Sequence, residues 1–209
     1  SKGHAGPAVY AALALSGFFP YEMLKTLNQP GTSLPSHCDR NKTPGVDMTT
    51  GSLGQGTSLA CGMALGEKLR GRDARVFLIV GDGEANEGQV WEACMFAAAK
   101  KLGNLVLLLD VNGKQLDGCT KDILDTFDLA AKLEAFGFDT VSIDGNDIEQ
   151  VYNALERTRN GGDKPYAVVL NTIKGKGVAG VEQAKSNHSM AVSADQWNEW
   201  LQSLTAQLN

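Results

Sequence analysis

Several features that mark specialised classes of protein are missing from this sequence. It has no run of ~20 apolar residues that could span a bilayer, and no basic-then-apolar signal segment opens it. Lys and Arg number 19 against 24 Asp and Glu, which gives a formal net charge of −5 and little support for general nucleic-acid binding. We therefore expect a soluble, cytoplasmic protein that has neither nucleic acid nor a membrane as its partner.

Cysteine motifs are missing as well. None of the four cysteines belongs to a C-x-x-C pair, which argues against a zinc knuckle or a thioredoxin-type site. Their wide spacing is typical of reduced thiols rather than of a disulfide framework. A P-loop signature is also absent, so a nucleotide-binding module has no support from that motif.

The chain has the length and composition of one globular domain. Its 209 residues are 43% apolar, which is enough to form a hydrophobic core that needs no disulfide bonds or structural metal ions. Strands are expected at 75–80, 105–110, 140–143 and 166–171. Helices are expected at 5–16, 21–27, 55–70, 87–101, 122–136, 147–157 and 195–208, with loops at 28–50 and 174–193. Strands that alternate with helices predict an α/β fold with a mostly parallel sheet flanked by helices.

Asp82 is the first candidate for chemistry. It follows a buried strand and lies between Gly81 and Gly83, which let the chain turn tightly and let an anion approach the amides. The next helix directs its positive end toward the same place. A carboxylate beside an anion requires a cation between them, so a divalent metal that bridges Asp82 to a phosphate is one interpretation. A plain turn with a capping Asp explains Gly-Asp-Gly alone equally well.

Asn112 favours the metal interpretation. It ends the next predicted strand, thirty residues after Asp82, an interval that one helix and one strand fill. The two side chains are then expected at adjacent strand ends, where ligands of open α/β sheets bind. Carboxylate and amide oxygens, with a nearby carbonyl, are ligands that Mg²⁺ prefers. The alternative for Asn112 is an ordinary Asn-Gly turn.

The motifs around these residues resemble those of transketolases. Gly-Asp-Gly followed by Asn at this spacing is similar to the thiamine-diphosphate-binding motif. Further transketolase-like motifs occur in the same order over nearly the whole chain, at 1–5, 49–56, 62–64, 81–93, 110–118, 144–145 and 174–177. The chain looks most similar to the separately encoded amino-terminal subunits of split transketolases. The resemblance implies the diphosphate-binding (PP) fold and transfer of a two-carbon ketol unit between sugar phosphates, as in the pentose phosphate pathway.

The resemblance also implies a set of cofactor ligands. Mg²⁺, or Ca²⁺ or Mn²⁺ in its place, would be held by Asp82, Asn112 and the carbonyl of Lys114. The diphosphate of thiamine diphosphate would lie against the amide of Gly83. Two more residues match positions near the aminopyrimidine and thiazolium rings, namely Gly51 and Leu53.

All three histidines fall where transketolases have active-site histidines. The resemblance implies that His4 and His37 bind substrate hydroxyls. It places His188 near the diphosphate and the reacting carbonyl. An imidazole with a pKa near neutrality can donate a hydrogen bond or move a proton in such a site. The chain departs from the family pattern at Cys38, Asn187 and Ser189.

The resemblance further implies a partner polypeptide. Residues 1–209 correspond to a single PP-type domain, and the family's first segment, which carries another substrate-facing histidine, would lie upstream of Ser1. The glutamate that activates the aminopyrimidine belongs to the family's next, pyrimidine-binding domain. We therefore expect a heterotetramer with a carboxy-terminal subunit. Contact between copies of this chain is expected at the helix that carries Glu87 and Glu92.

Two kinds of alternative remain open at this point. One is a related thiamine-diphosphate enzyme, either a 2-oxoacid dehydrogenase α subunit or a deoxyxylulose-phosphate synthase. The other is a non-catalytic, regulatory remnant, which the missing upstream segment favours and the intact Asp82, Asn112 and histidines disfavour.

Overall fold

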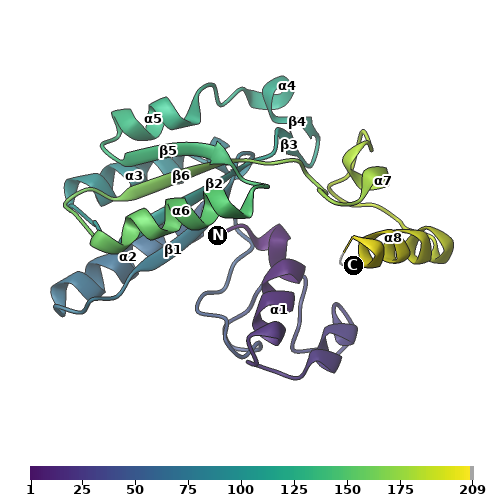
Figure 1. Ribbon diagram of the computed structural model, residues 1–209. Coiled ribbons are helices and arrows are strands. Elements are labelled where there is room, and N and C mark those ends of the chain that lie inside the picture. Colours follow the sequence, from purple (N-terminus) through teal and green to yellow (C-terminus); the bar gives the residue numbers. More distant parts are fainter. Residues whose placement is uncertain (208–209) are drawn as a thin grey trace.

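The computed structural model has one four-stranded parallel sheet at its centre (Figure 1). The structure describes residues 1–207. The strands are β1 (Val76–Gly81), β2 (Leu105–Val111), β5 (Asp139–Asp144) and β6 (Tyr166–Asn171), in the order β1-β2-β6-β5. All three neighbouring pairs are parallel, so the strands end at the same edge of the sheet. The predicted α/β fold is confirmed.

Helices cover both faces of this sheet, because its central strands are apolar on both sides. On β2, Leu105, Leu107 and Leu109 pack into the larger core, and Val106 packs into a smaller one on the other face. The larger core also contains side chains of α2 (Gln55–Leu69), α3 (Gly88–Ala99) and α5 (Leu129–Ala135). The smaller core includes Ala154 of α6 (Ile148–Arg157). Continuous apolar strands are what a doubly covered parallel sheet requires.

The amino-terminal part forms a separate small cluster beside the sheet. Helix α1 (Gly6–Leu15) packs against the 3-10 helix η2 (Tyr21–Thr26) and the loop that follows, around the buried side chains of Tyr10 and Leu34. The phenol of Tyr10 donates a hydrogen bond to the carbonyl of Pro35 at 2.7 Å. Before α1, the amide of Lys2 bonds to the carbonyl of Ile79 on β1. This contact attaches the first residues of the chain to the edge of the sheet.

The prediction of one helix over 122–136 was wrong. That stretch contains α4 (Thr120–Leu124) and α5, separated by an extended connection. Phe127 has φ +51°, outside the helical region, and the Asp128 carboxylate caps α5 by accepting from the amide of Ala131 at 2.9 Å. A side-chain cap that satisfies a free amide stabilises a new helix start there. Residues 21–27 were predicted as a helix, and their helical part is the 3-10 helix η2.

The remaining helix predictions agree with the structure within a few residues. Residues 174–193 are irregular except for the short α7 (Ala179–Glu182), and the last helix is α8 (Ala194–Ala206), which begins with a capping box between Ser193 and Gln196. The predicted helix end at Leu208 lies outside the described residues. A small hairpin of β3 (Lys114–Gln115) and β4 (Gly118–Cys119) follows β2. None of the helices within residues 1–207 is long and apolar enough to cross a membrane.

Candidate active site

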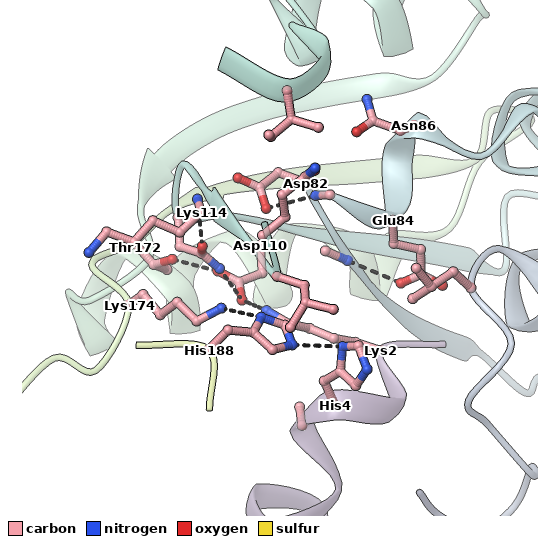
Figure 2. Close-up of a pocket in the computed structure, with 18 of the residues that line it drawn as sticks. Lys2, His4, Asp82, Glu84, Asn86, Asp110, Lys114, Thr172, Lys174 and His188 are labelled. Carbon is pink, nitrogen blue, oxygen red and sulfur yellow. Dashed lines mark hydrogen bonds and ion pairs between the residues drawn. The ribbon is translucent and has the colours of Figure 1, made fainter. Parts of the chain in front are cut away.

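A cavity of about 850 Å³ opens at the carboxyl ends of β1 and β2 (Figure 2). Its walls include the first residues of the chain, Leu53, the turn after β1, the β2–β3 connection, the end of α4, and the loop after β6. The pocket has the size of sites that bind cofactors and other small molecules. It also lies where open α/β sheets bind their ligands.

Asp82 forms the floor of this cavity and is only 2% exposed. Its backbone amide bonds to the carbonyl of Asp110, which continues the β1–β2 ladder by one residue. Its carboxylate accepts hydrogen bonds from the amides of Gly83 at 2.8 Å and Gly113 at 2.7 Å, and from the hydroxyl of Thr120 at 3.2 Å. These donors fix the carboxylate in one orientation, at the end of its strand.

Asn112 lies at the end of the neighbouring strand, as predicted from its spacing. Its Nδ2 donates toward Asp110 Oδ2 at 3.4 Å, and its Oδ1 accepts from the amide of Lys114 at 3.1 Å. The Asp110 carboxylate therefore orients the amide, because only the nitrogen can donate to it. The amide oxygen is left on the side of the β3 backbone.

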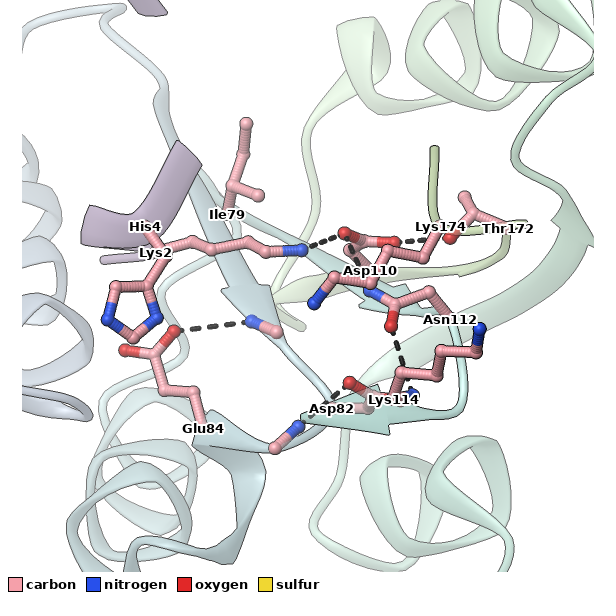
Figure 3. Close-up of polar contacts among 12 residues, drawn as sticks. Lys2, His4, Ile79, Asp82, Glu84, Asp110, Asn112, Lys114, Thr172 and Lys174 are labelled. Carbon is pink, nitrogen blue, oxygen red and sulfur yellow. Dashed lines mark hydrogen bonds and ion pairs between the residues drawn. The ribbon is translucent and has the colours of Figure 1, made fainter. Parts of the chain in front are cut away.

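The Asp110 carboxylate, near the end of β2, contacts two other parts of the chain that line the pocket (Figure 3). Its carboxylate forms an ion pair with Lys2 and accepts a hydrogen bond from the hydroxyl of Thr172. Burial by itself raises the pKa of Asp110, but the bonds from Lys2 and Thr172 outweigh it and hold that pKa below its usual value. Asp110 is therefore ionised at neutral pH and keeps Lys2 at the strand ends.

The oxygen donors fit a hard divalent cation. Asp82 and Asn112 supply a carboxylate and an amide oxygen from adjacent strands, and both line the cavity with Lys114. Within residues 1–207, no group of three or more His, Cys, Asp or Glu side chains converges as a metal cage. Mg²⁺ characteristically binds one or two carboxylates together with phosphate oxygens. The donor set is thus of the kind that holds Mg²⁺ on a diphosphate.

Three lysines give the cavity positive charge. Lys2, Lys114 and Lys174 all line it. Lys174 is partly buried, and burial together with the neighbouring Lys2 lowers its pKa from the usual 10.5. Clustered lysines that repel one another are relieved by an anion between them. A diphosphate has the charge to fill this place.

His188 lies between Lys174 and His4, which belongs to the segment at the start of the chain. One ring nitrogen, Nδ1, lies 2.8 Å from Lys174 Nζ, and the other, Nε2, lies 3.1 Å from His4 Nδ1. The two imidazoles meet edge to face, with ring centroids 4.6 Å apart. Burial lowers the pKa of both histidines from 6.5, and the positive charge of Lys174 lowers them further. Both rings are therefore neutral at pH 7 and able to donate or accept a proton.

We expect NMR titration of the cofactor-free protein to give midpoints below 6.5 for both His4 and His188. Replacing Lys174 by Gln should raise the midpoint of His188, because it removes a positive charge 2.8 Å from the ring. Lys164→Gln, at the amino end of β6, is the matched control and should leave both midpoints unchanged. An unchanged His188 midpoint in Lys174→Gln would contradict this account of its pKa.

His37 and Gly51 lie next to the cavity rather than in its lining. The His37 ring is 5.3 Å from that of His4 and packs against the backbone of Gly51, whose φ of +137° favours glycine. A Cβ at Gly3 would meet both His37 and Gly51 closer than 3.0 Å. This contact brings the segment of His4 against the loop that leads to Leu53, which does line the cavity.

Comparison with known proteins decides the family. Residues 1–207 match the family described as "Transketolase, thiamine diphosphate binding domain". The chain belongs to the transketolase family. It is 49% identical over 197 residues to the 6-deoxy-6-sulfo-D-fructose transketolase subunit SqwG of Clostridium sp. (strain MSTE9), covering 94% of this chain and 72% of that protein. It is 41% identical to an apulose-4-phosphate transketolase subunit of Actinobacillus succinogenes, covering 94% of this chain and 71% of that one.

Solved transketolases have the same fold. A transketolase variant from Pichia stipitis superimposes with a TM-score of 0.83 at 28% identity, and covers all of this chain. The transketolase of Campylobacter jejuni gives 0.83 at 29% identity. The chain spans only 36% and 33% of those two proteins. The predictions of the transketolase family and of the thiamine-diphosphate-binding fold are confirmed.

The transketolase domain brings most of the predicted site residues together. Those that line the cavity are His4, Leu53, Asp82, Gly83, Asn112, Lys114 and His188. Of the two acidic residues predicted at an interface, Glu87 lies at the margin of the cavity and Glu92 is exposed on α3. Their roles stay predictions.

Several polar residues of the cavity were not singled out from the sequence, among them Lys2, Glu84, Asp110 and Lys174. Each lies inside a stretch that carries the transketolase resemblance. Their position within these motifs was therefore the only feature of the sequence that pointed to them as site residues. It could not separate side chains that face the cavity from those that do not.

Proposed function

We propose that this chain is the diphosphate-binding subunit of a two-polypeptide transketolase. It would transfer a two-carbon ketol unit from a ketose to an aldose, each carrying an anionic group. The observation that carries this proposal is the pairing of Asp82 and Asn112 at adjacent strand ends, in one cavity that lysines and histidines also line. The two relatives that are named as transketolase subunits support it.

The proposed cofactors are thiamine diphosphate and Mg²⁺. Asp82, Asn112 and the Lys114 carbonyl would hold the metal, and the Gly83 amide with Lys174 would hold the diphosphate. Gly51 and Leu53 would lie toward the rings of the cofactor. Thiamine diphosphate, when bound, would supply nucleophilic carbanion chemistry toward a carbonyl group. The chain's own task is to fix the diphosphate and exclude water around it.

The histidines would transfer protons and bind the hydroxyl groups of the substrate. His4 and His188 face each other at 3.1 Å at the cavity wall, and both are neutral at pH 7. A neutral imidazole can donate to a substrate oxygen and later return the proton, as general acid–base catalysis requires. His37, beside His4, would bind a further substrate hydroxyl.

The proposed partner is a carboxy-terminal transketolase subunit with the pyrimidine-binding domain. Two copies of each chain would form a heterotetramer, with contact between copies of this chain near Glu87 and Glu92. One relative is named for 6-deoxy-6-sulfo-D-fructose and another for apulose 4-phosphate. We propose a sugar of this anionic class as the substrate. A role in the pentose phosphate pathway and a cytoplasmic location stay predictions.

The test is an assay of the full-length protein mixed with such a partner, thiamine diphosphate and Mg²⁺. We expect transfer of a two-carbon unit from a sulfonated or phosphorylated ketose to an aldose phosphate, and no transfer by either chain alone. Pyruvate as the donor is the control, since 2-oxoacid dehydrogenases and deoxyxylulose-phosphate synthases use it. Turnover of pyruvate would favour those enzymes. Cofactor binding without any transfer would favour a non-catalytic remnant.

A further inference from the structure

A buried carboxylate that lines the cavity has no role in the proposed chemistry. Glu84 begins the short 3-10 helix η3 (Glu84–Asn86), directly after the Gly-Asp-Gly turn, and is only 3% exposed. Glu, like other charged residues, is almost never buried unless it is paired or hydrogen-bonded. The contacts of Glu84 therefore indicate what its charge does.

Glu84 accepts three hydrogen bonds from three separate segments. Its Oε1 accepts from the amide of Gly54 at 2.8 Å and from the hydroxyl of Ser1. Its Oε2 accepts from the amide of Gly81 at 3.2 Å, the contact drawn in Figure 3. Along the chain, Ser1 is 83 residues from Glu84, Gly54 is 30 residues away, and Gly81 is 3 residues away. One side chain thus joins segments that no single secondary-structure element connects.

Each of these segments carries a residue of the proposed site. Gly54 follows Leu53 at a turn with φ +81°, and Gly81 precedes Asp82. Ser1 begins the segment that contains Lys2 and His4. Glu84 is therefore bonded to the three segments that are proposed to hold the cofactor rings, the metal and the substrate.

Close backbone packing makes the three segments depend on one another. A Cβ at Gly56 would lie 2.6 Å from that of Ser1, and the Lys2 side chain passes 3.5 Å from a Cβ built on Gly81. The Ser1–Lys2 segment therefore lies close against the backbone at Gly56 and Gly81. Loss of the bonds to Glu84 would displace the segments together or leave buried amides unpaired.

We propose that Glu84 is a positioning residue that sets the distance between the metal-binding turn, the Leu53 loop and the His4 segment. The inference rests on the proposed function, because it assigns those segments to cofactor and substrate. A carboxylate suits the task because it accepts at both oxygens and has no donor. Glutamine keeps one acceptor for Gly54 and presents an NH₂ group to the amide of Gly81, where two donors oppose each other. Alanine removes every contact.

The test is the dissociation constant of thiamine diphosphate in the full-length chain with its partner and Mg²⁺. We expect Glu84→Ala to weaken binding by roughly 10-fold to 100-fold, the range found when residues that support a metal site are removed. Glu84→Gln should show an intermediate loss. Glu149→Gln, the same change at an exposed position on α6, is the matched control and should bind as the wild type does.

Hydrogen exchange of the cofactor-free chain separates positioning from general stability. In Glu84→Ala, we expect faster exchange in peptides that contain Gly54 and Gly81, while the centre of β6 keeps its protection. Unfolding of the whole domain would instead raise exchange everywhere, and would contradict the inference. Equal cofactor affinity in wild type and Glu84→Ala would overturn it and leave the proposed function standing. Failure of the wild-type complex to bind the cofactor would overturn both.

Discussion

Replacing Asp82 by alanine is expected to abolish the magnesium-dependent binding of thiamine diphosphate. Asp82 is the buried carboxylate at the carboxyl end of β1, beside the Asn112 amide. Without it, the metal would lose its charged protein ligand, and the diphosphate would lose the cation that neutralises it. Calorimetric titration of the full-length protein and its partner, with Mg²⁺ and with chelator, should show binding by the wild type only when Mg²⁺ is present. The variant should show none in either condition.

Asp82 also has a structural task, so a second variant is needed. Its carboxylate accepts from Gly83, Gly113 and Thr120, and alanine would leave these donors unpaired. Asp82→Asn keeps the shape and removes the charge, and should lower cofactor affinity about 10-fold or more while the fold remains. Asp73→Asn, in the exposed connection before β1, is the matched control. Wild-type affinity in a folded Asp82→Asn would contradict the metal site.

Replacing His188 by alanine is expected to slow ketol transfer strongly while the cofactor still binds. His188 lies between Lys174 and His4 and is neutral at pH 7, and in the proposed function it exchanges a proton with the substrate. Positioned acids and bases typically contribute about 10²-fold to 10⁴-fold to a rate, and we expect kcat/KM to fall within that range. Steady-state kinetics of the complex at saturating cofactor would measure the loss.

His188→Gln separates proton transfer from hydrogen bonding. Its amide can still donate from near the Nε2 position but has no pKa near neutrality. If His188 moves a proton, Gln should be almost as slow as Ala; if it only holds the substrate, Gln should recover most of the activity. Cofactor titration of both variants is the control, because the effect is predicted on turnover. Unimpaired kcat/KM in His188→Ala would remove this residue from the mechanism.

Local sequence pattern predicted elements well where local forces decide them. The strands β2 and β6 are continuous apolar runs because both faces are covered, and such runs are unambiguous between glycines and polar turns. The pattern failed at 122–136, where Lys132, Leu133 and their neighbours favour a helix throughout. There the Asp128 cap and the left-handed Phe127 divide the segment, and neither is visible in hydrophobic periodicity.

The candidate site was predictable where a motif and its spacing correspond to adjacent strand ends. Asp82 and Asn112 meet because parallel neighbours β1 and β2 end at one edge. Glu84 was not predictable in this way. Its three partners are Ser1, Gly54 and Gly81, and only the folded chain brings their donors to one carboxylate.

The sequence by itself determined the family, the α/β class and the residues at the ends of β1 and β2, because these follow from motifs and from local apolar runs. Only the tertiary structure decided how charge is arranged around them. It paired Lys2 with Asp110. It also partly buried His188 and His4 and placed Lys174 against His188, and this burial and positive charge lower the pKa of both histidines. Electrostatic interactions depend on distance and burial rather than on separation along the chain. The segments that supply these charges are far apart in sequence and meet only when the sheet has formed.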